Sequence, residues 1–419
     1  MIFSELADVN PKVKLSRGTV YSLIEMEDIL PGKRYVKAVK SKAFKGGGSK
    51  FCANDILFAR ITPCLENGKI AQFKGNGGTV GFGSTEFFIF RAKKGISDEG
   101  FLFYLAYSDI LRKPAEGSMF GASGRQRAIL DVVRSTVIPD ISLGNQRKIS
   151  AILSAYDDLI ENNTRRIQIL GEMAQRIFGE WFVDFRFPGH EKVKRINSEM
   201  GKIPEGWQVV SVGDVIDSIE SGSRPKGGID PNEKGVPSIG AENILGLGQY
   251  EFEKEKYVSK NFFENMRRGI VKSGDVLLYK DGAKIGRKSM FRDGFPHEVC
   301  CINEHAFILR TNLKCSRNYL YFYLDRSDIT QMIIGLNANA AQPGINQPGV
   351  KGLPFLLPEK RLIDLFDEQA EPLMGLLFNL AKKNKILREK RDILIPKLIS
   401  GEINVSEMAI AVRDQLNVT

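Results

Sequence analysis

Apolar residues recur at alternating intervals of three and four positions in two long stretches of the chain. In residues 146–182 this spacing predicts one long helix whose apolar stripe needs a partner, as in the seam of a coiled coil. About 36 residues of helix would be about 54 Å long. The seam positions are Ile149, Ile152, Tyr156, Leu159, Ile167, Leu170, Met173, Ile177 and Trp181.

The second periodic stretch predicts a helix from about Glu359 to Ile399. Its seam consists of Leu362, Phe366, Leu373, Leu380, Leu387 and Leu394. Pro372 lies within it and predicts a kink or break. Asn163 and Asn384 interrupt the two seams, and a polar group there can fix the register at some cost in stability.

Each seam needs an apolar partner, and the simplest partner is the other copy. We therefore expect the two helices to pair as an antiparallel coiled coil with pseudo-two-fold symmetry. Apolar residues outside the seams, such as Ile160, Phe178 and Phe182, suggest a further interface with another protein.

The segments that precede these helices contain short strand-like and turn-like pieces. Residues 51–61 and 85–92 are β-branched or aromatic runs bounded by turn residues, and 99–113 has helical spacing. We expect an α+β protein with two tandem globular domains, each followed by a long helix. Its parts are a first domain at 1–145, a central helix at 146–182, a linker at 183–200, a second domain at 201–358, a C-terminal helix at 359–405 and a tail at 406–419.

The two halves of the chain repeat one plan. "YLAYSDI" at 104–110 recurs as "YLDRSDI" at 323–329. Upstream, "NDILFARITP" (54–63) corresponds to "GDVLLYKDGA" (274–283), and in both a carboxylate precedes an apolar run and a basic residue. The order of features is the same in both halves, so the sequence predicts an internal duplication.

Length and composition indicate a globular protein of about two to four domains. The chain has 419 residues, of which 42% are hydrophobic, and no apolar run approaches the roughly 20 residues that span a bilayer. The N-terminal sequence "MIFSELADVN" carries acidic residues where a signal peptide would be basic. Five cysteines without a Cys-x-x-Cys pair fit a reducing compartment. We therefore expect a cytoplasmic protein that makes no contact with a membrane.

The net charge of +10 and the pI of about 9.2 favour a nucleic-acid partner, whose phosphates attract a basic surface. The alternative is an ordinary basic protein. Sequence motifs for catalysis are missing: the chain has no Walker motif, no Gly-x-Ser-x-Gly elbow and no Asn/Asp-Pro-Pro-aromatic tetrad for amino-methylation of a base. "HEVCCINEH" (297–305) offers zinc ligands, but a buried strand is the simpler interpretation, because a strand aims adjacent cysteines at opposite faces. We expect a non-catalytic protein.

Three stretches resemble the specificity (S) subunit of type I restriction-modification systems. "GKIPEGWQVVSVGDVIDSIESGSRP" (201–225) is similar to the start of a recognition domain in that family, and "LREKRDILIPKLISGEINV" (387–405) is similar to its closing helix. "GIN" (344–346) with "LPFLLP" (353–358) fits the end of a recognition domain. The first half departs from this pattern: it lacks the "GKIPEGW" opening, and "GRQRAI" (124–129) stands where the second half has "GINQPG".

The resemblance implies a chain without catalytic residues or cofactors of its own. Each of its two target-recognition domains would read one half of a bipartite site in double-stranded DNA, and the paired helices would set the spacer between the halves. Two modification (methyltransferase) subunits would clasp the helices and supply S-adenosylmethionine, and restriction (translocase/endonuclease) subunits would use ATP and Mg. The alternative is a self-contained bivalent nucleic-acid-binding adaptor that works without catalytic partners.

Candidate DNA-binding residues are basic and amide side chains predicted to lie on loops, since such groups contact phosphates and base edges. For any one of them the alternative is an ordinary solvated loop charge. The first half contributes Lys45, Lys50, Arg60, Lys69, Arg125, Gln126 and Arg127. The second half contributes Ser223, Arg224, Lys226, Lys280, Lys284, Arg287, Gln342 and Asn346.

Overall fold

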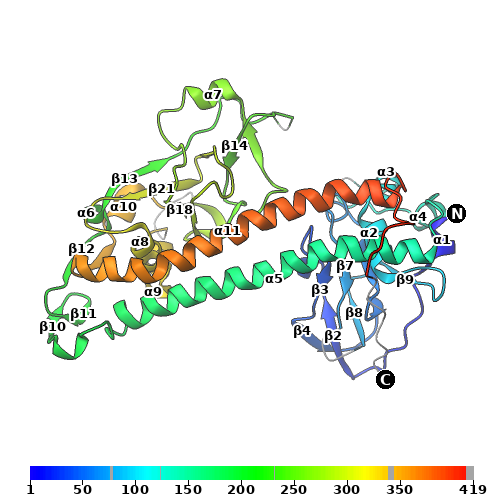
Figure 1. Ribbon diagram of the computed structural model, residues 1–419, viewed down its shortest axis with the longest axis horizontal. Helices are drawn as coiled ribbons and strands as arrows, with labels where there is room; N and C mark the ends of the chain where they lie inside the picture. The colour runs from blue at the N-terminus through cyan, green and yellow to red at the C-terminus, as the bar shows by residue number, and fades with distance from the viewer. Residues whose placement is uncertain (76–78, 123, 231, 338–343, 412–419) are drawn as a thin grey trace. The chain divides into compact units, whose positions relative to one another are not determined.

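The chain divides into two compact units. The computed structural model describes residues 1–75, 79–122, 124–230, 232–337 and 344–411. The first unit contains Met1–Glu161 and the chain from Ile386 onwards, and the second contains Asn162–Lys385. Two 40-residue helices, α5 (Leu143–Phe182) and α11 (Lys360–Ile399), each contribute residues to both units (Figure 1).

In its described residues, the first unit has two sheets, four short α-helices and one 3-10 helix besides its part of the long helices. One sheet has the order β1-β9-β6-β7-β3 and the other β4-β2-β8-β5. The strands are β1 (Ala7–Val9), β2 (Val20–Ile24), β3 (Tyr35–Val36), β4 (Lys40–Ala43), β5 (Ser49–Cys52), β6 (Ile56–Ala59), β7 (Ile70–Phe73), β8 (Val80–Gly83) and β9 (Phe87–Ala92). The helices are α1 (Phe3–Leu6), η1 (Met26–Asp28), α2 (Glu99–Tyr107), α3 (Asp109–Gly117) and α4 (Leu130–Ser135).

The central strands of the first unit are apolar on both faces because both faces are covered. In β6, Ile56 and Phe58 belong to the core that includes helix α2, while Leu57 belongs to a second core with Phe51 of β5. Alternate side chains of a strand point to opposite faces, so one strand serves both cores. The expected strands at 51–61 and 85–92 are confirmed in β5, β6 and β9.

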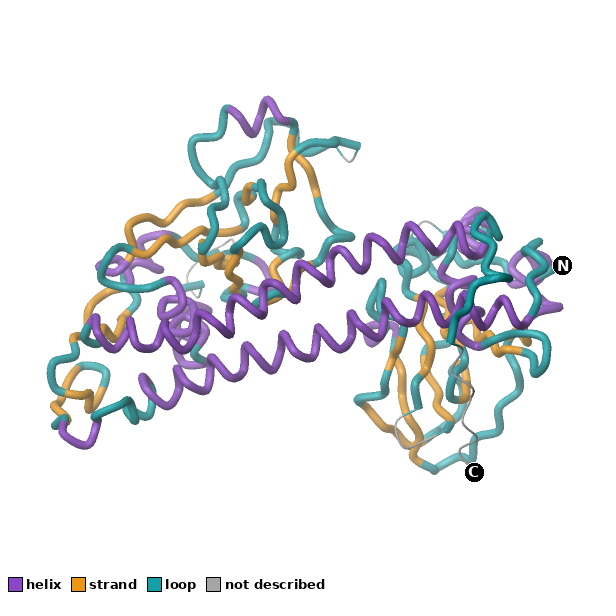
Figure 2. The backbone as a smooth tube through the Cα atoms, in the orientation of Figure 1, coloured by secondary structure: helices purple, strands orange, loops and turns teal. Residues whose placement is uncertain are grey.

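The second unit repeats this arrangement with sheets of four and three strands in place of five and four. Its strands are orange in Figure 2. Its sheets have the orders β13-β21-β18-β19 and β17-β14-β20, and β10-β11, β12-β22 and β15-β16 pair separately. The strands are β10 (Arg195–Ser198), β11 (Gly201–Pro204), β12 (Gln208–Ser211), β13 (Ile216–Ser221), β14 (Val236–Ile239), β15 (Ile244–Gly246), β16 (Gln249–Tyr250), β17 (Lys256–Val258), β18 (Asp275–Tyr279), β19 (Lys288–Phe291), β20 (Cys301–Ile302), β21 (Ala306–Thr311) and β22 (Pro354–Leu357). The helices are η2 (His190–Lys192), α6 (Val212–Val215), α7 (Lys260–Glu264), η3 (Gly282–Lys284), α8 (Arg317–Asp325), α9 (Ser327–Gly335) and α10 (Gln347–Lys351).

The topology confirms the internal duplication. The antiparallel order β1-β9-β6-β7 of the first unit corresponds to β13-β21-β18-β19 of the second, and the parallel pair β2–β8 corresponds to β14–β20. The repeated heptapeptide joins α2 to α3 in the first unit and α8 to α9 in the second. Tyr104 and Tyr323, which it aligns, are both fully buried.

One ion pair is repeated with the fold. Arg91 of β9 donates to both carboxylate oxygens of Asp55 at 2.7 Å, and Arg310 of β21 donates to both of Asp275 at 2.7–2.8 Å. Each aspartate also accepts a backbone N–H from three residues upstream. The carboxylate that begins both repeated segments therefore fixes the start of the central strand, which explains why the duplicated sequence keeps it.

Within the second unit, the C-terminal part of α5 packs antiparallel against the N-terminal part of α11. Phe182 meets Phe366 with ring centroids 5.4 Å apart, and toward the other end Asn163 Nδ2 donates to Asn384 Oδ1 at 3.0 Å. Both asparagines are buried. The two predicted polar interruptions thus bind each other, as a register-fixing pair should.

Within the first unit, the N-terminal part of α5 packs against the C-terminal part of α11 around a buried charge cluster. Arg391 of α11 pairs with Asp157 of α5, and the Tyr104 hydroxyl donates to the other carboxylate oxygen of Asp157 at 2.6 Å. Arg391 also donates to the Gly32 carbonyl at 3.1 Å, and Arg34 donates to the Tyr104 hydroxyl at 3.3 Å. The cluster therefore joins both helix segments to α2 and to the loop before β3.

Several predicted details of the helices are wrong. Helix α5 begins at Leu143, three residues before the predicted start, and α11 ends at Ile399, so 400–405 are not helical. Pro372 lies inside the unbroken helix α11. Phe178 and Phe182 are buried in the core of the second unit and offer no surface to a partner, while Ile160 is half-buried.

Some residues that were predicted to form the seam of the long helices are exposed, and some buried residues of these helices were not predicted. Leu159 and Met173 are about half exposed, whereas Leu153, Ala174 and Met374 are fully buried. The buried helix positions also include an alanine and paired charges, which a search for large apolar residues passes over. The predicted linker at 183–200 is also more structured than expected, since it contains η2 and β10, and Phe187 packs on Trp207 at 5.4 Å.

The chain has an α+β fold with two long helices, as the sequence predicted in outline. Among the described residues, no helix is both long enough and apolar enough to cross a membrane. Ser406 accepts a hydrogen bond from Asn145 at 2.9 Å, so the start of the predicted tail is anchored to α5, and 412–419 lie outside the described residues.

Candidate nucleic-acid interface

In the first unit, three predicted residues meet where β6 ends and β9 begins. Arg60 follows β6, and its Nε donates to Glu86 at 3.1 Å. Arg127 approaches the same carboxylate and donates to it through Nε and Nη2 at 2.7–3.1 Å. The hydrogen bonds from Arg127 hold the pKa of Glu86 below its usual value of 4.5. One carboxylate therefore keeps two guanidinium groups side by side at the edge of the sheet.

Backbone pairing explains why these residues come together. The Arg127 amide donates to the Phe120 carbonyl at 3.0 Å, and the Phe120 amide donates back at 3.1 Å, so this segment folds as a short hairpin. Thr62 N donates to the Gln126 carbonyl at 2.9 Å, which attaches the hairpin to the chain just after β6. Arg125 and Arg127 are exposed, and Gln126 is half-buried.

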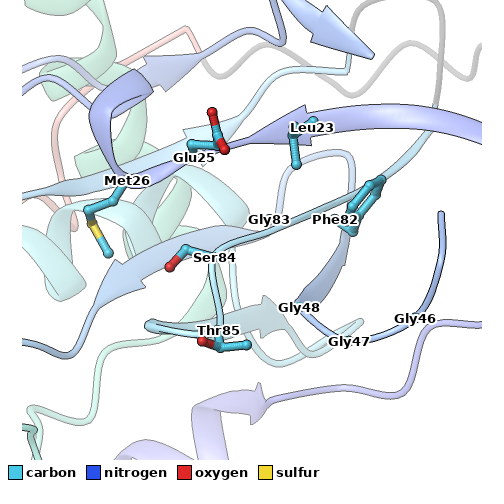
Figure 3. A pocket seen from close by; sticks show the side chains of 10 residues that line it. All are labelled: Leu23, Glu25, Met26, Gly46, Gly47, Gly48, Phe82, Gly83, Ser84 and Thr85. Atoms are coloured by element: carbon cyan, nitrogen blue, oxygen red, sulfur yellow. The ribbon is translucent and has the colours of Figure 1, made fainter. Parts of the chain in front are cut away.

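A glycine loop forms the wall of a cavity in the same unit. Gly46, Gly47 and Gly48 all have positive φ, and a Cβ on Gly48 would lie 2.5 Å from the Gly83 carbonyl oxygen. Only glycine therefore permits this approach. The cavity of about 450 Å³ is lined by that loop together with Leu23, Glu25, Met26, Phe82, Gly83, Ser84 and Thr85 (Figure 3).

The three predicted lysines of the first unit differ in how far their ammonium groups are available for binding DNA. Lys45 is exposed at the start of the glycine loop. Lys50 lies on strand β5, not on a loop as predicted, with its ammonium group 5.1 Å from the centre of the Phe44 ring. Lys69 donates to the Met26 carbonyl at 2.7 Å and is half-buried, so it ties η1 to the β6–β7 connection.

The corresponding edge of the second unit carries a different set of charges. Lys280 follows β18 as Arg60 follows β6, and its ammonium group lies 5.0 Å from the Phe307 ring and 3.4 Å from Ser221 Oγ. Arg224 pairs with Glu304 at 3.0 Å. His305 Nδ1 lies 2.9 Å from both oxygens of Asp281. Sequence reasoning considered His305 only as a zinc ligand and did not choose Glu304, His305 or Asp281 for this edge, although they stand directly before β21 and after β18.

A second cavity, of about 590 Å³, lies beside the β18–β19 connection. Lys284 and Arg287 line it, together with Lys288, which the sequence gave no reason to choose. Lys288 is almost fully buried and donates to the Gly286 carbonyl at 2.7 Å and to Thr330 Oγ1 at 2.9 Å. Burial lowers the pKa of Lys288. Lys284 is exposed, while Arg287 donates to the Ile244 carbonyl at 3.4 Å.

Three of the remaining predicted residues, Ser223, Lys226 and Asn346, lie outside helices and strands. Lys226 is exposed and Ser223 is half-buried. Asn346 caps helix α10 by accepting from Gly349 N at 2.8 Å, which uses its carbonyl oxygen in the fold. Gln342 lies outside the described residues.

The zinc alternative at 297–305 finds no support in the described part of the chain, where no cluster of potential ligands could hold a metal ion. Cys300 and Cys301 are buried, and burial raises the pKa of Cys301 to about 11. A thiolate, the form that binds metal, is thus disfavoured. His297 instead contacts Glu255, and His305 contacts Asp281.

Residues 204–364, which contain the second of these edges, match the family described as the Type I restriction modification DNA specificity domain. The specificity subunit of the type I restriction enzyme EcoEI from Escherichia coli is 32% identical in an alignment of 459 residues that covers 85% of this chain and 74% of the relative. The chain belongs to the specificity subunits of type I restriction enzymes. The MjaIX specificity subunit of Methanocaldococcus jannaschii is 25% identical over 324 residues, which cover 75% of this chain and 71% of the relative.

The solved S subunit of a type I restriction-modification system from M. genitalium has the same fold as this specificity subunit. It aligns over 95% of both chains with a TM-score of 0.50 and 17% identity. The family acts as the non-catalytic component that recognises DNA in a restriction system, which confirms the predicted function. The self-contained adaptor is not supported.

Proposed function

We propose that each recognition domain of this specificity subunit reads one half of a bipartite site in double-stranded DNA. The observation that carries the proposal is the repetition of the fold together with its basic edge. Arg60 in the first unit and Lys280 in the second occupy the same place, after the central strand of equivalent sheets. Basic side chains at that edge position DNA through its phosphates and read base edges.

The charges at the two edges differ, and this difference supports two distinct half-sites. The first edge presents Arg60 and Arg127 around Glu86, while the second presents Lys280, Arg224 and the His305–Asp281 pair. An arginine offers two parallel donors, and a lysine offers a point charge. The two domains would therefore select different bases, and the recognised sequence would be asymmetric.

We propose further that α5 and α11 pair along their length as an antiparallel coiled coil, with pseudo-two-fold symmetry between the domains. The antiparallel contacts within each unit support this, since Asn163 meets Asn384 in the second and Asp157 meets Arg391 in the first. Such a rod would set the spacer between the two half-sites. Two-fold arrangements of DNA readers commonly match two half-sites of DNA in this way.

Two modification subunits are the proposed partners along the helices. Apolar side chains that are 41–61% exposed support a docking role for both helices: Leu159, Ile386 and Ile393 in the first unit, and Ile169, Met173 and Leu376 in the second. Exposed apolar stripes of this kind mark protein interfaces. The modification subunits would hold S-adenosylmethionine, and restriction subunits would use ATP and Mg, so the specificity subunit would need no cofactor of its own.

Purification with and without the modification subunits tests this proposal. The chain alone should be poorly soluble and bind DNA weakly, because its apolar helix residues lack a partner. With co-expressed modification subunits, it should bind and methylate one bipartite sequence. A chain that is monodisperse alone and binds a bipartite site at nanomolar affinity would contradict the dependence on partners.

A further inference from the structure

The backbone of Arg60 is held by hydrogen bonds on both sides, as is that of Lys280 in the second unit. The Arg60 amide donates to the Glu86 carbonyl at 3.0 Å, and the Arg60 carbonyl accepts from Ala128 N at 2.8 Å. The backbone of Arg60 is thus fixed on both sides, by the start of β9 and by the segment that follows the Phe120–Arg127 hairpin. The fixed backbone therefore defines the position from which the Arg60 side chain extends.

The guanidinium group of Arg60 is also oriented. Its Nε donates to Glu86 Oε2 at 3.1 Å, and its Cζ lies 5.5 Å from the centre of the Phe88 ring. Glu86 is held in turn, because its carboxylate accepts from Arg127 and its amide donates to Ser84 Oγ at 3.1 Å. The carboxylate and the ring constrain the plane of the guanidinium group before any ligand is bound.

The terminal nitrogens of Arg60 remain available. Among the described residues, none accepts a hydrogen bond from Nη1 or Nη2, and a third of the side chain is exposed. A guanidinium group in a fixed plane with two parallel donors matches the O6 and N7 acceptors of guanine in the major groove. A phosphate can also accept both donors of an arginine, so the experiment below separates a guanine contact from a phosphate contact.

The second unit provides an internal comparison. Lys280 occupies the equivalent position and lies over the equivalent ring, Phe307, at 5.0 Å. The cation above an aromatic ring is therefore common to both repeats, but the planar pair of donors exists only at Arg60. The residue before the neighbouring strand also differs, with Glu86 in the first unit and His305 in the second.

We propose that Arg60 reads one guanine in the half-site of the first recognition domain, and that Glu86 is the positioning residue that fixes its guanidinium plane. The assignment rests on the proposed function and adds the base, the residue and the half-site. Arg127 acts through Glu86, because the hydrogen bonds that its Nε and Nη2 donate keep the carboxylate in place.

The test compares Arg60→Lys and Glu86→Gln with wild type in the complete complex with modification subunits. Arg60→Lys keeps the charge and removes the paired donors. Methylated positions are mapped across a genome, and binding is measured to duplexes that carry the recognised sequence. The matched control is Arg134→Lys in the same unit, because Arg134 is exposed and its ion pair with Asp131 spans 3.8 Å.

Arg60→Lys should relax one guanine position in one half-site, with discrimination reduced about five- to 150-fold there and unchanged elsewhere. Glu86→Gln should relax the same position less, and Arg134→Lys should leave the motif unchanged. A motif that stays intact while Arg60→Lys weakens all sites equally would overturn the proposal and assign Arg60 to a phosphate. Relaxation in both half-sites would overturn it as well.

A measurement on the wild-type complex does not depend on how the variants fold. Replacing each guanine of the recognised half-site in turn by 7-deazaguanine removes the N7 acceptor. One position should weaken binding about fivefold or more in wild type, and Arg60→Lys should show little further loss at that position. Insensitivity at every guanine, or a half-site without guanine, overturns the proposal. A wild-type complex with no sequence preference would instead contradict the proposed function.

Discussion

Replacement of Arg391 by alanine tests how the first recognition domain is attached to the helices. Arg391 is 4% exposed and Asp157 is 8% exposed, and the pair lies between α5, α11 and the loop that contains Gly32. Removing the guanidinium group leaves the Asp157 carboxylate buried with one remaining donor, the Tyr104 hydroxyl. It also leaves the Gly32 carbonyl without its donor.

The expected cost follows from this burial. Breaking a buried ion pair by removing one partner costs about 3–5 kcal/mol, because an uncompensated charge remains in a region of low dielectric. Replacing both partners by apolar residues of similar volume is often neutral. The double variant Arg391→Met with Asp157→Leu should therefore be more stable than Arg391→Ala alone. The two changes should be strongly non-additive, since the residues are in direct contact.

Hydrogen exchange in the assembled complex measures the effect locally, which suits a chain of two units better than a single melting curve. A loss of 3 kcal/mol corresponds to roughly a hundredfold faster exchange of the amides around Asp157 and Arg391. Lys37→Ala is the control, because the Lys37–Glu161 pair is about half exposed and should contribute less than about 1 kcal/mol. Equal exchange in Arg391→Ala and Lys37→Ala would refute the assigned role of the buried cluster.

Two further predictions concern the proposed rod and the edge of the first sheet. Four residues inserted next to Asn163, with a matched insertion near Leu380, add about 6 Å of helix and about 40° of rotation. The mapped methylation motif should therefore gain one base pair of spacer. An active complex that keeps the original spacer would show that the paired helices do not set the spacer length. The pKa of Glu86 is lowered, so its ion pairs stabilise the fold at pH values above about 4.5 and this contribution is lost as the pH falls through the lower folded-state pKa. Exchange of the Arg127 amide should therefore accelerate in acid in wild type more than in Glu86→Gln, and equal acid dependence in the two proteins would contradict this.

The sequence predicted the plan of the molecule because repetition is visible without structure. The duplicated heptapeptide, the strands at 51–61 and 85–92, and the polar interruptions Asn163 and Asn384 all follow from spacing and residue type. The hydrogen bond between these two asparagines comes from the structure alone. The sequence did not predict which positions of the two long helices are buried. Ala174 and Asp157 are among these positions, and no rule based on large apolar residues selects an alanine or an aspartate.

The candidate site could be predicted in part. Arg60, Gln126 and Arg127 come together as neighbours, and their basic or amide side chains were the signal for choosing them. Glu86 was missed because acidic residues were not considered for a DNA-binding edge, although a carboxylate is what orients an arginine. Residue type alone also does not show that the Lys69 ammonium group donates to the Met26 carbonyl.

The central claim is that the two recognition domains read separate half-sites, and exchange of one domain tests it most directly. Residues 208–358 begin with β12 and end just after β22, and these two strands pair with each other, so the segment is closed at its ends. Replacing it by the matching segment of a related specificity subunit, followed by mapping of methylated positions in cells, gives one decisive comparison. The account predicts a new sequence in one half of the motif, with the other half and the spacer unchanged. A change in both halves, or in neither, would contradict it.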